Sequence, residues 1–166
     1  MTRYTIDPES STVTFAARTT LHPVVATAPT SGWFEAEISE DRFAADSRLA
    51  GALEIAVDTL SSGNPLYDAE TRRRIDVRLH PLIAAEITST RDVEGPGAVV
   101  EGTVTFHGEA VLLEGELALL PGLVLSGEGT VDIRWWDLHP PRLLAYRVDP
   151  EVVISVELAL RPDETA

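Results

Sequence analysis

The feature that most constrains the fold of this chain is an alternation of apolar and polar residues with a period of two, repeated in segment after segment. In residues 110–119, for example, Leu113 and Leu117 fall on one face and Glu114 and Glu116 on the other. Successive side chains of a strand point to opposite faces, so this pattern predicts strands with one buried and one solvated face. The segments that show it are residues 3–7, 11–18, 32–39, 49–55, 82–90, 98–106, 110–119, 123–134 and 151–160.

Eight or nine consecutive strands of this kind indicate a large antiparallel sheet, because one-sided alternation is typical of antiparallel pairing. Such a sheet has two edges with unpaired backbone groups, and closing the sheet into a barrel removes both of them. A β-sandwich would also hide the apolar faces. We therefore predict an all-β fold, an extended antiparallel barrel of about eight strands, with the sandwich as the alternative.

A single stretch, residues 65–76, has the pattern of a helix. Asn64 can accept a hydrogen bond from a free N–H of the first turn, and Pro65 fits the first helical position. Asp68 and Arg72 are four residues apart with the acid first, which is the favourable order for a surface ion pair. The sequence therefore predicts one short helical insertion between two strands.

The connections between strands are predicted from their turn residues. Residues 19–30 contain Pro23 and Pro29 and are predicted to form a long loop. The other predicted connections are a polar turn, a hairpin turn and an irregular crossing, at residues 40–47, 91–97 and 135–145 respectively.

Composition restricts the class of protein. A chain of 166 residues suffices for one domain with its own core, so we expect residues 1–166 to form a single domain. The net charge is −14, and all 13 basic residues are Arg. Nucleic-acid binding needs clustered cations that neutralise phosphates, so this acidity argues against a nucleic-acid partner. It argues equally against electrostatic docking on anionic lipid.

The chain has no Cys, which excludes disulfides, thiolate catalysis and metal sites built on Cys. Its first residues, Met1-Thr-Arg-Tyr-Thr-Ile-Asp7, contain no apolar core of a secretory signal. No apolar run is long enough to span a membrane. We therefore expect a cytoplasmic protein without an integral membrane segment.

No residue pattern predicts catalysis or metal binding. Three His residues, His22, His80 and His139, precede a proline at loop ends, and no two His residues have the spacing of metal ligands. A Gly-x-Ser-x-Gly nucleophile elbow is absent, and paired carboxylates such as Glu35 and Glu37 fall on outward faces. We expect a non-enzyme with no catalytic residues, no metal site and no cofactor.

The inward positions of the strands carry unusually small residues. Gly in a strand interior costs stability and usually serves a bend or a close approach of the backbone. The other interpretation is a tunnel, since a barrel of about eight strands is either filled or holds one slim ligand. In that case Gly127→Leu would block the tunnel. The glycines on or near inward positions are Gly51, Gly102, Gly115, Gly127 and Gly129.

Residues 72–74, Arg-Arg-Arg, form the densest basic cluster, and on a helix they point in different directions. They either pair with acidic residues on the surface or place one Arg at the polar head of a ligand. Trp33, Trp135 and Trp136 either line the mouth of a barrel as amphipathic rings or plug its end.

Several motifs occur in a fixed order along nearly the whole chain. Taken together, their order and spacing resemble the YceI-like family of polyisoprenoid-binding proteins. The motifs are Tyr4-Thr-Ile-Asp-Pro-Glu-Ser-Ser-Thr-Val-Thr-Phe15, Gly32-Trp-Phe34, Val57-Asp-Thr59, Thr59-x-x-Ser-Gly-Asn64, Asp68 to Ile75, His80-Pro81, Asp132-Ile133, Pro140-Pro-Arg142 and Val148-Asp-Pro-Glu-Val-Val-Ile154.

The resemblance implies a lipocalin-like, extended antiparallel β-barrel that holds a long isoprenoid chain in its interior. The small inward residues would then line a tunnel for a polyisoprenoid or similar slim lipid of the isoprenoid quinone type. Such a protein would serve storage, transport or a stress response; its partner is a hydrophobic small molecule, and a homodimer is possible. The predicted lining residues are Val13, Phe15, Phe34, Ile55, Ile87, Val104, Leu117, Gly127, Val131 and Ile154.

Two alternatives remain open on the same fold. One is a ligand-free structural or interaction protein, which a dry and filled barrel would favour. The other is an enzyme with an unrecognised site, which a polar pocket with two facing His or acidic residues would favour.

Overall fold

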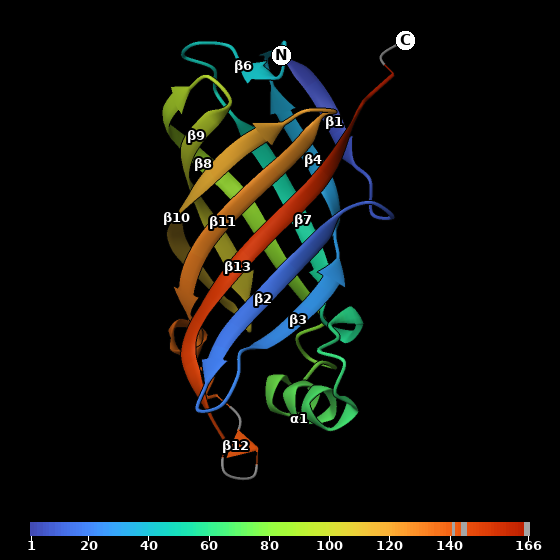
Figure 1. Cartoon of the computed structure of the whole chain (residues 1–166), viewed down its shortest axis with the longest axis vertical. Helices are drawn as coiled ribbons and strands as arrows, with labels where there is room; N and C mark the ends of the chain where they lie inside the picture. The colour runs from blue at the N-terminus through green and yellow to red at the C-terminus, as the bar shows by residue number, and fades with distance from the viewer. Residues whose placement is uncertain (141, 144–145, 165–166) are drawn as a thin grey trace.

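The computed structural model of the chain is an elongated antiparallel β-barrel with one helix at one end (Figure 1). It describes the backbone of residues 1–140, 142–143 and 146–164, and the side chains of residues 1–140 and 147–164. Within these residues eight strands close into a ring in the order β1-β4-β7-β8-β9-β10-β11-β13, because β13 pairs with both β11 and β1. The predicted all-β barrel is confirmed.

The strands of the ring are β1 (Thr2–Ile6), β4 (Ser31–Ala36), β7 (Ala50–Ala56), β8 (Leu82–Glu94), β9 (Gly97–Phe106), β10 (Glu109–Leu120), β11 (Val124–Asp132) and β13 (Tyr146–Pro162). The other strands are β2 (Thr12–Thr19), β3 (Val24–Pro29), β5 (Ile38–Ser39), β6 (Arg42–Phe43) and β12 (Arg142–Leu143). The helical elements are η1 (Val57–Thr59), α1 (Pro65–Ile75) and η2 (Ile133–Trp136). No helix among the described residues is long and apolar enough to cross a membrane.

Strand β13 is 17 residues long and has two different neighbours on one side. Near its C-terminal end it pairs with β1, for example Leu160 with Ile6, whereas further back it pairs with β2, for example Val152 with Ala17. The upper end of the barrel, with the N-terminus and the end of β13, is therefore closed by β1 (Figure 1). The lower end, with α1, is extended by the branch β2–β3.

Residues 24–29 form strand β3, which corrects the prediction of a loop over residues 19–30. β3 pairs antiparallel with β2, for example Ala26 with Phe15. Pro23 lies just before the strand and Pro29 at its end. Proline is tolerated at such positions of an edge strand, because no hydrogen bond from the middle of a ladder is lost. The two prolines therefore bound a strand instead of marking a loop.

The polar turn predicted at residues 40–47 is correct in part: residues 40–41 and 45–46 are turns, but residues 42–43 form β6 of the hairpin β5–β6. Phe43 on β6 is buried, and its ring meets the ring of Phe34 edge to face with centroids 6.3 Å apart. The Phe43 N–H donates to Gly95 O, which attaches the hairpin to the β8–β9 turn. The hairpin closes the upper end of the barrel. The single large apolar residue of this segment, Phe43, is the sequence signal that could have predicted this closure.

Three other boundaries differ from the prediction. β8 continues to Glu94, so the hairpin turn predicted at residues 91–97 is confirmed but is limited to residues 95–96. Register shifts after Ile87 and Thr90 mark bulges that bend β8. β11 ends at Asp132, where the first turn of η2 begins. β13 already begins at Tyr146, while residues 141, 144 and 145 of the predicted crossing lie outside the described residues.

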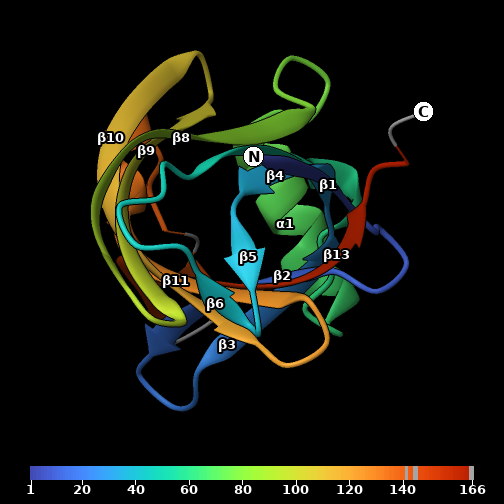
Figure 2. The same cartoon turned by 90° about the horizontal axis from the view of Figure 1, so that it is seen from above.

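Two clusters of buried apolar side chains fill the interior. The upper cluster contains Phe34 and Phe43, and the lower cluster contains Val13 and faces α1. Leu53 and Val156 contact both clusters. Seen along the barrel, α1 lies within the outline of the strands and below them (Figure 2). The core is therefore continuous along the barrel and consists of an upper and a lower half.

Two of the inward glycines serve close packing. A Cβ atom at Gly102 would lie 2.6 Å from Glu86 O, because the backbones of β8 and β9 approach each other beside the bulge. A Cβ atom at Gly127 would lie 2.8 Å from Val156 Cγ2 and 2.9 Å from Leu117 Cδ2. Neighbouring side chains thus occupy the space above Gly127, and Gly127→Leu would overpack the wall instead of testing for a tunnel.

Candidate ligand cavity

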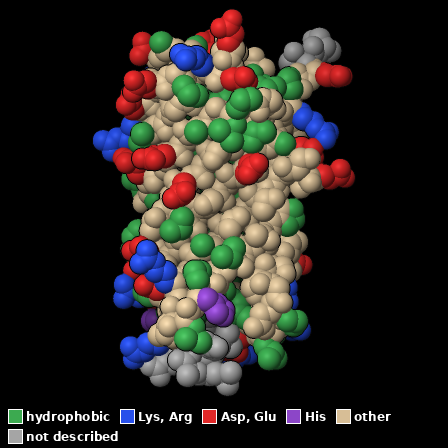
Figure 3. Space-filling view, in the orientation of Figure 1, with side chains coloured by type: hydrophobic (Ala, Val, Ile, Leu, Met, Phe, Trp, Pro, Cys, Tyr) green, Lys and Arg blue, Asp and Glu red, His purple; other side chains and the backbone are tan. Residues whose placement is uncertain are grey.

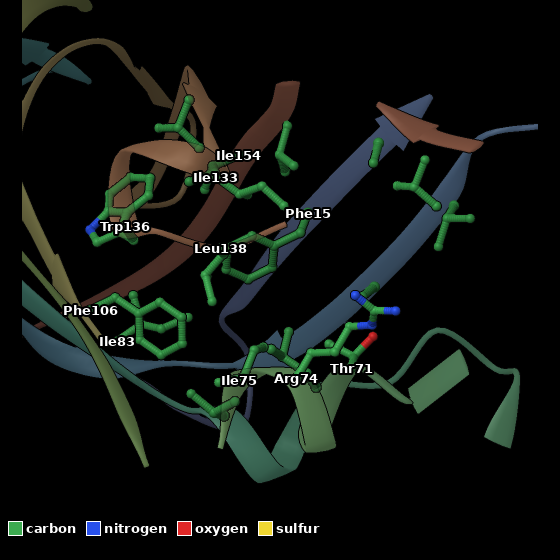
Figure 4. Close-up of a pocket in the computed structure, with 18 of the residues that line it drawn as sticks. Phe15, Thr71, Arg74, Ile75, Ile83, Phe106, Ile133, Trp136, Leu138 and Ile154 are labelled. Atoms are coloured by element: carbon green, nitrogen blue, oxygen red, sulfur yellow. The ribbon is translucent and has the colours of Figure 1, made fainter. Parts of the chain in front are cut away.

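The lower half of the barrel contains a cavity of about 190 Å³ between the strands and α1 (Figure 4). An apolar cavity of about 150 Å³ in another protein binds benzene, so this cavity has room for a small ring or a short isoprenoid unit. The apolar residues that line it are Phe15, Ala17, Val24, Ala26, Val57, Leu60, Ile75, Ile83, Val104, Phe106, Val131, Ile133, Trp136, Leu138, Val148, Val152 and Ile154.

The helix that covers the cavity begins where the sequence predicts. Asn64 Oδ1 accepts hydrogen bonds from two N–H groups of the first turn, and Pro65 occupies the first helical position. The helix ends at Ile75, because Asp76 adopts the left-handed conformation with a φ of 55°. The predicted helical insertion is confirmed to within one residue.

One face of α1 is turned toward the cavity. Tyr67, Thr71 and Ile75 are spaced four residues apart, line the cavity and are partly buried. Leu66, on another face, is 79% exposed. All 11 residues of the helix are at least partly exposed, so α1 covers the cavity without a fully buried face of its own.

Hydrogen bonds attach α1 to the segment before it. Asp68 accepts hydrogen bonds from the N–H and the hydroxyl of Ser62, the latter with Oγ 2.6 Å from Oδ1. Arg72 Nη2 donates to the carbonyl oxygens of Asp58 and Leu60, at 3.2 and 3.3 Å. Within the described residues Asp68 and Arg72 do not form the predicted ion pair, because each bonds to the preceding segment instead.

Glu70 pairs with the two arginines that follow. Arg73 Nη2 lies 2.7 Å and Arg74 Nε 2.8 Å from Glu70 Oε1. Hydrogen bonds from Arg73 and then Arg74 lower the pKa of Glu70 from 4.5 to about 2. Arg73 therefore pairs on the surface, whereas Arg72 and Arg74 also border the cavity.

Most polar side chains that line the cavity come from α1, and we call this polar side of the cavity its mouth. Thr71 Oγ1 is buried and has no hydrogen-bond partner among the described residues. Burial raises the pKa of the Tyr67 hydroxyl, which keeps this group a hydrogen-bond donor. His139 and Asp149 border the mouth from the chain that joins η2 to β13 and from β13 itself. Figure 4 shows Thr71, Arg74 and Ile75 on the helical side, opposite the apolar wall of the barrel.

A seam in the lower wall runs beside α1, between β3 and β7. Among the described strands, β3 pairs with β2 along its length but is joined to the η1–α1 segment by one bridge, Thr27 with Ser61. The two residues exchange backbone hydrogen bonds of 2.9 and 3.0 Å. Thr30 Oγ1 adds a hydrogen bond to Glu54 O on β7. The wall is therefore incompletely paired here, and the η1–α1 segment lies beside the gap.

A second cavity, of about 140 Å³, lies higher in the barrel. Val104 lines both cavities, and Leu53 and Val156 contact both core clusters. We call these three residues the separating layer. Even together the cavities only reach the lower end of the range of about 300–1,000 Å³ for ligand pockets. A long chain could occupy both cavities only if the separating layer moved.

Seven of the ten predicted lining residues border one of these cavities. Those at the lower cavity are Phe15, Val104, Val131 and Ile154, and those at the upper cavity are Phe34, Ile87, Leu117 and again Val104. Val13, Ile55 and Gly127 border neither and are buried in the wall or core. Contact between any of the ten and a ligand stays a prediction.

Sequence reasoning missed the residues that close the lower cavity. Ala26 was overlooked because its segment was predicted to be a loop. The spacing of Tyr67, Thr71 and Ile75 is the signal that could have identified the cavity-facing side of the helix. No local pattern indicated that Leu138 lines the cavity. It lies in the predicted irregular crossing and reaches the cavity through the tertiary fold.

The three Trp residues have three different positions. Trp136 is 3% exposed and plugs the lower core, and its Nε1–H donates to Val104 O at 3.2 Å. Trp135 is 47% exposed at the lower end. Trp33 lies on β4, where the guanidinium of Arg3 stacks 4.2 Å from the centre of its ring.

The fold brings His80 and His107 together, with ring centroids 4.0 Å apart. Sequence spacing could not show this, because His80 follows α1 and His107 lies in the β9–β10 turn. Neither residue is among those that border the two described cavities. Within the described part of the chain, no group of three His, Cys, Asp or Glu residues could hold a metal ion.

A family comparison assigns the chain. The model of the YceI-like domain matches residues 4–160, which is nearly the whole sequence. The chain belongs to the YceI-like family. The resemblance inferred from the motifs is thereby confirmed. A search of curated proteins found no match to this YceI-like chain.

Three solved structures resemble this YceI-like domain. Burkholderia cenocepacia BcnA has a TM-score of 0.74 and 15% identity, over 94% of this chain and 99% of the other. A polyisoprenoid binding domain from Saccharophagus degradans, implicated in plant cell wall breakdown, has a TM-score of 0.68 and 13% identity, over 98% and 100%. The Campylobacter jejuni YceI protein has a TM-score of 0.65 and 11% identity, over 86% of each chain. At these identities the likeness shows the fold alone.

Proposed function

We propose that residues 1–166 act as one domain that binds a polyisoprenoid or similar slim lipid, without catalysis, for storage, transport or a stress response. The observation that carries this proposal is the apolar cavity under α1, whose polar lining comes mainly from this helix. Membership of the YceI-like family and the fold shared with a polyisoprenoid binding domain support this class of ligand.

The polar head of the ligand lies against α1 in this proposal. The hydroxyls of Tyr67 and Thr71 and the guanidinium of Arg74 offer donors there, so the head group is a hydrogen-bond acceptor. Asp68 and Asp149 border the same mouth. A neutral acceptor such as the carbonyl of a quinone suits this surrounding better than a diphosphate, whose charges would face both carboxylates.

The apolar tail extends upward from the lower cavity. A tail longer than one or two isoprenoid units reaches the upper cavity by displacing side chains of the separating layer. Burial of the tail contributes roughly 25 cal/mol per Å² of apolar surface, reduced by the cost of ordering the chain. Burial of the tail therefore provides the affinity, and the polar groups at the mouth set the orientation of the ligand.

Extraction with organic solvent followed by mass spectrometry tests the proposal on protein purified from its natural cells. The matched variants are Ala26→Trp, which fills the lower cavity, and Val25→Trp, which changes the outer face of the same strand. We expect about one isoprenoid per chain from the wild type and from Val25→Trp, and a loss of it from Ala26→Trp.

Absence of lipid from folded wild-type protein would contradict the proposal and favour a ligand-free interaction protein. Chemical conversion of a lipid incubated with the protein would contradict the non-catalytic role. The cytoplasmic location, the absence of a nucleic-acid partner and the possibility of a homodimer stay predictions. Cell fractionation, nucleic-acid gel shifts and light scattering test them in that order.

A further inference from the structure

Most of the strongly exposed apolar side chains lie at the lower end of the barrel. They come from the β2–β3 connection, from α1 and the chain after it, from the start of β8, and from η2. Their exposed fractions run from 47% to 79%. Figure 3 shows apolar side chains near the lower end of one face. The residues of this lower rim are Leu21, Leu66, Leu79, Leu82 and Trp135.

Charge is divided unequally between the two ends. The described segments at the lower end, residues 17–25, 56–83, 105–111, 131–140 and 147–152, carry seven Arg and nine acidic residues, a net charge of −2. The other residues whose side chains the structure describes carry five Arg and eighteen acidic residues, a net charge of −13. Acidity of the whole chain, which argued against electrostatic docking on lipid, is therefore nearly absent at the lower end.

We propose that the lower rim docks on the surface of a phospholipid bilayer, with α1 toward the membrane. The apolar side chains would enter the interface, where Trp is favoured, while arginines such as Arg73 and Arg78 would reach the phosphates. The acidic upper end points away. β13 has 17 residues, and each adds about 3.3 Å to its length. The upper end therefore lies several Debye lengths, of about 8 Å each, from the membrane.

The position of the cavity supports a bilayer as the partner. The mouth of the lower cavity lies on the side of α1, at the lower end of the barrel and near the seam between β3 and β7 (Figure 1). A lipid could then pass from the membrane into the barrel without crossing bulk water, where its tail would be exposed. This role of docking in lipid transfer rests on the proposed function, but docking on the membrane is itself measured without any bound ligand.

Co-sedimentation with phosphatidylcholine vesicles, with and without phosphatidylglycerol, tests the docking. The variant Leu66→Glu/Leu79→Glu removes two side chains of the lower rim that border neither cavity. The control Leu112→Glu/Leu120→Glu makes the same charge change at exposed positions of β10. We expect the rim variant to lower vesicle binding about tenfold, because each Leu loses apolar burial, and the control to bind as the wild type does.

Quenching of Trp fluorescence by brominated phosphatidylcholine gives the orientation. Trp135 belongs to the lower rim, whereas Trp33 lies on β4 beside Arg3. We expect Trp135→Phe to remove most of the quenching and Trp33→Phe to leave it unchanged. Equal quenching in both variants would overturn the proposed orientation.

Two other outcomes would overturn the docking itself. One is a folded wild-type protein that binds neither kind of vesicle. The other is a dimer that Leu66→Glu/Leu79→Glu dissociates without any vesicle binding, since a second copy of the chain then covers the rim. Vesicle binding by protein that yields no extracted lipid would support docking while contradicting the proposed function, so the two failures are distinguishable.

Discussion

The upper and lower halves of the barrel are built on the same strands but closed in different ways. The upper end is plugged from within by Phe43, whose hairpin is attached by a backbone hydrogen bond to Gly95. The lower end is covered from outside by α1, all of whose residues are at least partly exposed. One closure is therefore part of the core, and the other is a cover over a cavity.

This difference shows how a sheet of uniform appearance can hold a stable half and an adaptable half. Buried side chains at the upper end stabilise the fold in proportion to the apolar surface they remove from water. The lower end forgoes part of that burial and retains the larger of the two described cavities. Local openings are expected where buried apolar contacts are few, and that condition holds at α1.

The largest expected effect compares one Phe from each half. Phe34 is 2% exposed in the upper core, so Phe34→Ala should lower the free energy of unfolding by about 3–5 kcal/mol. Phe15 borders the lower cavity and is only partly buried, so Phe15→Ala should cost about 1–2 kcal/mol. Urea denaturation of lipid-free protein measures both. Equal losses would mean that the halves are packed alike.

A second change weakens the boundary between the halves. Leu53→Ala opens the separating layer and should join the two cavities. We expect the preference for a long over a short isoprenoid tail to rise about tenfold, because more tail is buried without displacing side chains. Competition binding with tails of different length measures it. Leu60→Ala is the control, since Leu60 borders the lower cavity and not the upper one, and a similar rise there would contradict the interpretation.

A third change makes the lower closure as firm as the upper one. Thr27 and Ser61 form a hydrogen-bonded antiparallel pair, whose Cα atoms are typically about 5.5 Å apart, within the range for a disulfide. The chain has no Cys, so Thr27→Cys/Ser61→Cys can form one intramolecular disulfide. Release of bound lipid, followed by transfer to acceptor vesicles, should slow several-fold on oxidation and recover on reduction. Identical rates in both states would exclude the seam as the exit.

The smallest expected effect is the response of α1 to acid. Hydrogen bonds from Arg73 and Arg74 lower the pKa of Glu70 from 4.5 to about 2. A lowered carboxyl pKa adds stability above the unfolded value, and this stability is lost as the pH falls from about 4.5 toward 2. Backbone NMR signals of α1 should shift over that interval before those of the upper barrel change. In Glu70→Gln this early change should disappear; its persistence would point to another group.

The barrel and the start of the helix were predictable because their signals are local. Alternation such as that of Leu113 to Glu116 reports a strand face, and the pair Asn64-Pro65 reports a helix start. The identity of neighbours is a tertiary property. Nothing in the local sequence shows that β13 pairs with both β1 and β2, or that Phe43 reaches the core from a polar segment.

The candidate site was predictable only in part for the same reason. Inward strand positions such as Phe15 and Val104 follow from the alternation. The division into two cavities depends on how side chains from different strands meet, as Leu53 and Val156 do between the clusters. The mouth depends on which face of α1 turns inward, and the contact between His80 and His107 depends on two connections that meet only in the folded chain.

The double pairing of β13 has a consequence for the order of events during synthesis. β1 and β2 are synthesised first, but one edge of each strand stays unpaired until β13, the last strand to be synthesised, pairs with it. Neither end of the barrel can close until almost the entire chain has emerged. Until then the apolar faces around Ile6 and Val13 stay open to solvent, and the nascent protein passes through its most aggregation-prone state just before completion.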